Sequence, residues 1–140
     1  MAELFKTAGI PYGISKDMDA MQKTHAAFVT ALSKHLYSGD RVREQSEVTS
    51  KESVHEITLS IKDYLSSLEK AGIKITPSKL KILLLCPVWL MDFSMGLLLK
   101  TKIASDVLFG GHSINVKDEV ELMDRDFADF LRQRNVSLLR

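Results

Sequence analysis

The chain has 140 residues, of which 45% are hydrophobic and 26% are charged, and its formal net charge is +1. This length and composition fit one globular domain with its own core and exclude a disordered chain. The balanced charge excludes a generally basic protein of the kind that neutralises nucleic-acid phosphates.

Residues 1–14 form an apolar N-terminal arm. Gly9, Pro11 and Gly13 interrupt any continuous helix there. Four of its side chains are nevertheless large and apolar: Leu4, Phe5, Ile10 and Tyr12. Because such side chains are unusual in a solvated tail, we expect the arm to fold back on its own domain or to dock on a partner.

A first long helix is expected over about 16–38, with Ser15 as its N-cap and Gly39 just beyond its end. Large side chains recur every three or four residues along one face: Met18, Met21, His25, Phe28, Leu32 and Leu36. This spacing is typical of an amphipathic helix. Since His25 lies on the apolar face, we expect it to be a core residue with a hydrogen bond inside the fold, rather than a ligand or a pH switch.

A second helix is expected over about 50–71, after a polar loop at 40–48. Thr49 and Glu52 have the spacing of a capping box, and Gly72 suits the position after the last turn. The apolar face of this helix has the same three-and-four spacing: Val54, Ile57, Ile61, Tyr64 and Leu68.

The third predicted helix, 77–102, is the most apolar segment of the chain. Thr76-Pro77 suits its start, and Pro87 should kink or break it. The other helices are apolar along one face only, whereas this one is apolar on all sides, so we expect it to be the buried centre of a bundle. The alternative is that Ile82–Leu99 inserts into a membrane, which a charge near its middle makes costly.

That charge is Asp92. Burial of an unpaired carboxylate is costly, so we expect Asp92 at an exposed edge, as a cap after Pro87, or in a buried pair with His25 or a lysine.

A fourth helix is expected over about 116–134, with Asn115 as its N-cap. Its apolar face is formed by one set of side chains: Val116, Val120, Met123, Phe127, Phe130 and Leu131. A short apolar tail, 136–140, follows the helix. Its apolar side chains are Val136, Leu138 and Leu139.

No catalytic, cofactor or metal motif is found in the sequence. The four histidines are scattered without ligand spacing, and Cys86, the single cysteine, is expected to be a small buried hydrophobe. We therefore expect no enzyme, no cofactor, no metal and no small-molecule substrate. The absence of a signal-peptide pattern and of cysteine pairs favours the cytoplasm or the inside of a host cell.

We therefore predict an all-α domain at 15–135: a compact bundle of four main helices around the third. The leading functional hypothesis is a non-enzymatic interaction or assembly module that forms homo-oligomers through its apolar arms, of the kind found in viral or effector-like settings. A membrane-associated protein is the first alternative. A nucleic-acid-binding protein is the second, because ITPSKLKILLL resembles the opening of a helix in winged-helix regulators, although no basic recognition helix or wing follows it.

Overall fold

The computed structural model describes Thr7 and residues 17–38, 41–109 and 117–138, and it confirms the all-α class. The described helices are α2 Met18–Ser33, η1 Lys34–Leu36, α3 Gln45–Val48, α4 Lys51–Lys70, η2 Ser78–Leu80, α5 Lys81–Leu85, α6 Val88–Leu99, α7 Lys102–Leu108 and α8 Lys117–Arg132. Two short strands, β1 Tyr37–Ser38 and β2 Arg41–Val42, pair antiparallel. The predicted first, second and fourth helices correspond to α2 with η1, to α4 and to α8.

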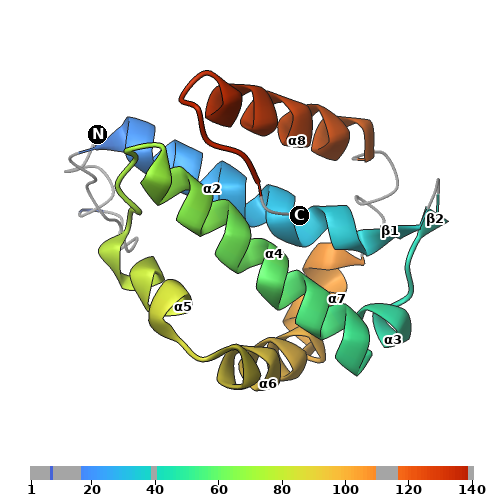
Figure 1. Cartoon of the computed structure of the whole chain (residues 1–140). Helices are drawn as coiled ribbons and strands as arrows, with labels where there is room; N and C mark the ends of the chain where they lie inside the picture. The colour runs from blue at the N-terminus through green and yellow to red at the C-terminus, as the bar shows by residue number, and fades with distance from the viewer. Residues whose placement is uncertain (1–6, 8–16, 39–40, 110–116, 139–140) are drawn as a thin grey trace.

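The helices pack in three layers. In Figure 1, α8 lies on one side of α2 and α4, and α5 and α6 lie on the other side. α4 contacts α2, α5 and α6, whereas α8 packs mainly on α2. α6 and α8 therefore form the two outer layers, each with one side toward the interior and the other facing outward.

The middle of the molecule is α4, and its predicted apolar face is confirmed. Small or polar buried side chains such as Ser60 and Ser67 extend the buried surface around the helix, and its large buried side chains repeat at intervals of three and four residues. They include Val54, Ile57, Ile61, Tyr64, Leu65 and Leu68. The exposed positions of α4 are polar or charged, so its apolar side chains are the ones that are buried. This burial stabilises the helix.

Both ends of α4 have recognisable caps. The Ser50 hydroxyl accepts a hydrogen bond from the Ser53 amide, so Ser50 is the N-cap where the spacing had favoured Thr49. At the C-terminus Gly72 has a φ of +82°, and the amide of Ile73 donates to the Leu68 carbonyl. This is a Schellman ending, in which glycine avoids the cost of a left-handed backbone.

The large side chains predicted for the first helix are buried only in part: Leu36 of η1 is buried and Phe28 and Leu32 are half-buried against the core, whereas Met18 and Met21 are exposed. The buried residues of α2 are Ala20, Thr24, Ala27, Thr30 and Ala31. The buried face of α2 is therefore displaced from the predicted one toward small side chains. His25 is exposed, so the prediction of a core histidine is wrong. The N-cap of α2 is Asp17, whose carboxylate accepts from the Ala20 amide, and the predicted cap Ser15 lies outside the described residues.

α8 packs on α2, and three side chains of its predicted apolar face are buried: Val120, Phe127 and Leu131. The Phe127 ring stacks on the Tyr64 ring of α4, with centroids 5.0 Å apart. The Tyr64 hydroxyl donates a hydrogen bond to the Asp124 carboxylate. Burial and this hydrogen bond raise the pKa of Tyr64 well above its usual value of 10. Val116 and Asn115 of the predicted helix lie outside the described residues.

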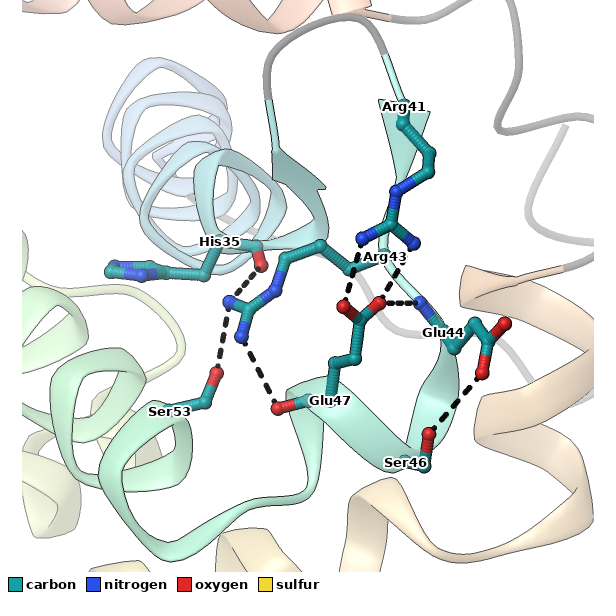
Figure 2. A network of polar contacts seen from close by, with 7 residues as sticks. All are labelled: His35, Arg41, Arg43, Glu44, Ser46, Glu47 and Ser53. Carbon is teal, nitrogen blue, oxygen red and sulfur yellow. Dashed lines mark hydrogen bonds and ion pairs between the residues drawn. The ribbon is translucent and has the colours of Figure 1, made fainter.

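The predicted loop at 40–48 contains β2 and α3, joined to their surroundings by two arginines (Figure 2). Arg43 donates to the carbonyl oxygens of His35 and Glu47 and to the Ser53 hydroxyl, at 3.1, 3.2 and 3.1 Å. Arg41 makes a two-pronged pair with the Glu47 carboxylate at 2.8 and 2.9 Å. These contacts tie the end of α2 to the start of α4.

We expect the Glu47 carboxylate to titrate with a pKa of about 2, because the Arg41 guanidinium and the Glu44 amide both hydrogen-bond its charged form. Its contribution to stability is present above the ordinary pKa of 4.5 and is lost as the pH falls toward about 2. Arg41→Gln should raise this pKa, as followed by NMR of the side-chain carboxyl group. Arg125→Gln, on the exposed face of α8, should leave it unchanged. An unchanged Glu47 titration in Arg41→Gln would contradict the pairing.

The predicted third helix is broken at Pro87, as expected. α5 ends at Leu85 and α6 begins at Val88, and the two segments meet at a bend of 119°. The Lys62 ammonium of α4 holds this bend by donating to the carbonyl oxygens of Leu83, Leu84 and Cys86, at 2.8, 2.9 and 2.7 Å. A lysine thus satisfies the carbonyl groups that the end of α5 leaves without helical partners.

The prediction that this segment is the buried centre of the bundle is wrong. α5 has no buried residue, and α6 buries only Met91, Met95 and Leu99, which face the interior. The centre of the molecule is α4 instead. Among the described helices, no single one is long and apolar enough to cross a membrane; η2–α5 and α6 reach that length and composition only as a bent pair.

Candidate interaction surface

The outward side of α6 is apolar. Eight of the eleven large hydrophobic side chains that are exposed in the described part of the chain lie on α5, α6 and α7, with exposed fractions between 39% and 83%. We call them the apolar surface: Ile82, Leu85, Trp89, Leu90, Phe93, Leu97, Leu98 and Ile103. Soluble monomers rarely expose large apolar patches, and such patches usually mark interaction sites.

The other outer layer shows what an outward helix face normally carries. Of the eight exposed positions of α8, seven are acidic or basic and only Leu122 is apolar. Of the six exposed positions of α6, five are apolar and the sixth is Ser94. The two helices occupy equivalent places in the layers, so the apolar side of α6 is a property of its sequence and not of its position in the fold.

Lysines flank the apolar surface. Residues 78–102 contain four lysines and one aspartate, a formal net charge of +3. Lys81 pairs with Glu69, whereas Lys79, Lys100 and Lys102 are exposed and form no ion pair with any described residue. α8, on the far side, contains six acids and three bases, a net charge of −3. The molecule is therefore electrically polarised, with its positive end at the apolar surface.

Asp92 lies on the side of α6 that faces α4. Its carboxylate is 2.8 Å from Nδ1 of His55, and the side chain is about one-quarter exposed. Asp92 is thus neither a cap nor a partner of His25 or a lysine, as had been considered. The pairing with His55 depends on how α4 and α6 are aligned, which the sequence does not state. It also leaves the outward side of α6 without any acidic group.

A groove of about 450 Å³ runs between the start of α4 and α6. Its apolar lining comes chiefly from the apolar surface, and a lysine from each helix contributes to its wall. The lining residues are Thr49, Lys51, Val54, Trp89, Asp92, Phe93, Gly96, Leu97 and Lys100. A second hollow of about 310 Å³, almost wholly apolar, lies on the other side of α6, against α2 and α7. The apolar surface therefore has a hollow on each side of α6.

A cavity of about 250 Å³ between η1 and α4 is lined entirely by polar or charged residues: Lys34, His35, Glu56, Ser60, Asp63 and Tyr64. Lys34 donates to the Tyr64 hydroxyl at 3.1 Å and pairs with Asp124 at 3.6 Å, so these groups satisfy one another. Burial and the neighbouring Lys34 lower the pKa of His35 below 6.5. No described serine or cysteine is hydrogen-bonded to a histidine side chain. The arrangement therefore resembles a structural ion-pair network more than an activated nucleophile.

The terminal side chains singled out in the sequence are only partly placed. Val136 and Leu138 are half-buried and pack against the core of their own chain, a position that does not favour a role in partner binding. The other five lie outside the described residues: Leu4, Phe5, Ile10, Tyr12 and Leu139. Cys86 is half-buried beside the core. Within the described residues, no group of three or more His, Cys, Asp or Glu side chains is placed to hold a metal.

Sequence reasoning missed the apolar surface because it assigned those side chains to the core. The signal was present: a helix apolar on all sides has an outer as well as an inner apolar face, and lysines stand at both ends of the segment.

Comparison of the chain with protein-family models, curated proteins and solved structures finds no match.

Proposed function

We propose that this protein is a non-enzymatic module that binds to the surface of anionic membranes through its apolar surface. The observation that carries the proposal is the outward face of α6, with Trp89, Phe93 and Leu97 exposed beside unpaired lysines. Interfacial helices of membrane-binding proteins have this composition, with aromatic and aliphatic side chains in the lipid and lysines at the headgroups.

The expected favourable and unfavourable energies are similar in size, which favours weak and reversible binding. Burying one large apolar side chain is worth about 1.5–3 kcal/mol. Each lysine close to an anionic surface adds about 1 kcal/mol. Three or four inserted side chains and three lysines therefore contribute about 8–15 kcal/mol, which is of the same size as the loss of free motion on association, on the order of 4–15 kcal/mol. The acidic face of α8 would point away from the lipid, so the charge polarity also favours one orientation.

The geometry favours binding in the plane of the membrane. The inner side of α6 packs on α4 through Met91, Met95 and Leu99, and the Lys62 contacts fix the bend to α5. An arrangement that crossed the bilayer would have to give up both sets of contacts. The apolar surface lies outside them and needs no rearrangement to enter the headgroup region. Binding to the leaflet that faces the cytoplasm, where anionic lipids are found, agrees with the compartment expected from the sequence.

Self-association remains the second candidate, because two apolar surfaces could also cover each other. It is less favoured, since a symmetric pairing of this surface brings lysines of one copy toward lysines of the other without acids between them. The C-terminal tail of the original hypothesis does not strengthen it, because Val136 and Leu138 already pack on their own core.

The test is co-sedimentation of the full chain with vesicles. We expect binding to vesicles that contain phosphatidylglycerol, weaker binding to phosphatidylcholine alone, and a loss of affinity as salt is added. The double change Phe93→Ser and Leu97→Ser should lower affinity about 100-fold, since two large side chains no longer enter the lipid.

The matched control is Leu122→Ser, which removes the single exposed apolar side chain of α8 and should leave vesicle binding unchanged. No binding to either kind of vesicle would overturn the proposal. If light scattering then showed a stable dimer that the Phe93 and Leu97 changes dissociate, the surface would be a subunit interface.

A further inference from the structure

We infer that the groove between α4 and α6 is a binding site for a single anionic lipid, with its headgroup at Lys51 and Lys100 and its acyl chain along α6. This inference rests on the proposed function and adds a specific lipid site to a general affinity for membranes. The groove is a hollow of about 450 Å³ and is continuous with the apolar surface through Trp89, Phe93 and Leu97.

One end of the groove carries the positive charge of two lysines. Lys51 begins α4 and Lys100 follows α6, and both line the groove. The Gln45 side chain of α3, the short helix before α4, donates to the Leu99 carbonyl at 2.7 Å. Lys51 and Lys100 are exposed and have no ion-pair partner among the described residues. Two such ammonium groups suit a phosphate headgroup.

The rest of the groove suits a hydrocarbon chain. From Lys100 the apolar lining continues through Leu97 and Phe93 to Trp89, eleven positions along the sequence, or roughly 16 Å at the rise of an α-helix. This length accommodates most of an extended acyl chain. Gly96 leaves room at the floor, because a Cβ there would contact only Val54, at 3.9 Å.

Asp92 sets the direction of the ligand. Its carboxylate lines the groove about two helical turns from Lys100 and is hydrogen-bonded to His55. It repels an anionic headgroup from the middle of the groove, while the lysine end attracts one. The headgroup is therefore expected at the lysine end only, with the chain directed toward Trp89.

Trp89 is the single tryptophan of the chain and lines the groove, so its emission reports directly on occupancy. The probes are lysophosphatidylglycerol and lysophosphatidylcholine below their micelle concentrations, with glycerol phosphate as the free headgroup. We expect a saturable blue shift at one lysophosphatidylglycerol per chain, affinity at least 10-fold weaker for lysophosphatidylcholine, and no shift with glycerol phosphate. Equal affinity for the two lipids, or a shift with glycerol phosphate alone, would overturn the inference.

The variants separate this site from general membrane binding. The pair Lys51→Gln and Lys100→Gln should weaken lysophosphatidylglycerol binding roughly 30-fold, whereas Lys79→Gln and Lys102→Gln, which remove the same charge outside the groove, should weaken it less than about 3-fold. Both pairs should reduce vesicle binding similarly. Gly96→Leu, which fills the groove, should abolish binding of the single lipid while the circular dichroism spectrum stays helical.

The two proposals can fail separately. If vesicles bind but the two lysine pairs weaken lysophosphatidylglycerol equally, the groove is not a site and the membrane function stands. If lysophosphatidylglycerol binds one to one and vesicles do not, the groove site stands and the membrane function is wrong.

Discussion

Replacing Ile61 with alanine is expected to lower the free energy of unfolding by about 2–5 kcal/mol, whereas Phe93→Ala should change it by no more than about 0.5 kcal/mol. Ile61 is completely buried in α4, so its removal leaves a cavity in the centre of the molecule. Phe93 is 71% exposed on α6 and loses few contacts when shortened. Urea unfolding followed by circular dichroism at 222 nm measures both.

This pair of variants tests which helix is the core. Phe93 belongs to the most apolar segment of the chain and Ile61 to an ordinary amphipathic helix, so composition alone predicts the opposite order. The measurement is made at low protein concentration without lipid, so that no partner covers α6. A loss in Phe93→Ala as large as that in Ile61→Ala would mean that the outer face of α6 is packed in the folded chain.

Lys62→Met is expected to lower the free energy of unfolding by about 2–4 kcal/mol, although lysine is usually a replaceable surface residue. Its ammonium group donates three hydrogen bonds to the carbonyl groups at the end of α5. A hydrogen bond to a charged group contributes about 1.5–3 kcal/mol, and the three contributions are not additive because they share one donor group. The same urea experiment measures the loss.

Lys74→Met is the matched control, because Lys74 is exposed and its ammonium forms no ion pair among the described residues. It should change stability by no more than about 0.5 kcal/mol. Hydrogen exchange should also be faster in Lys62→Met for the amides of α5, such as Cys86, which donates to the Ile82 carbonyl. Equal stability of the two variants would show that the bend at Pro87 is maintained without Lys62.

The helices themselves were predictable from spacing and breakers. The apolar face of α4 repeats at three and four residues, Gly72 ends it, and Pro87 divides the next segment, and all three features follow from local geometry. The face of α2 was less predictable, because Ala20, Ala27 and Ala31 are weakly hydrophobic and become a helix contact only when a second helix approaches closely.

The candidate site was not predictable in the same way. A helix apolar on all sides can be surrounded by protein, or can have one side on the protein and one side outward, and its sequence is the same in both cases. In this fold α8 packs on α2 and not on α6, so the outward side of α6 is left uncovered. The partner of Asp92 depends likewise on the alignment of α4 with α6, which brings His55 into reach and leaves His25 on an exposed face.

The contact between α2 and α8 has a consequence for biosynthesis, because the two helices are separated by most of the chain. At about 5–20 residues per second, roughly 5–20 seconds pass between synthesis of the end of α2 and synthesis of the end of α8. During that interval Tyr64 has no Phe127 to stack on, and the side of the first helix pair that α8 covers is bare. A chain that terminates before Lys117 therefore exposes apolar side chains on both outer sides at once, which makes truncated products targets for chaperones and proteases.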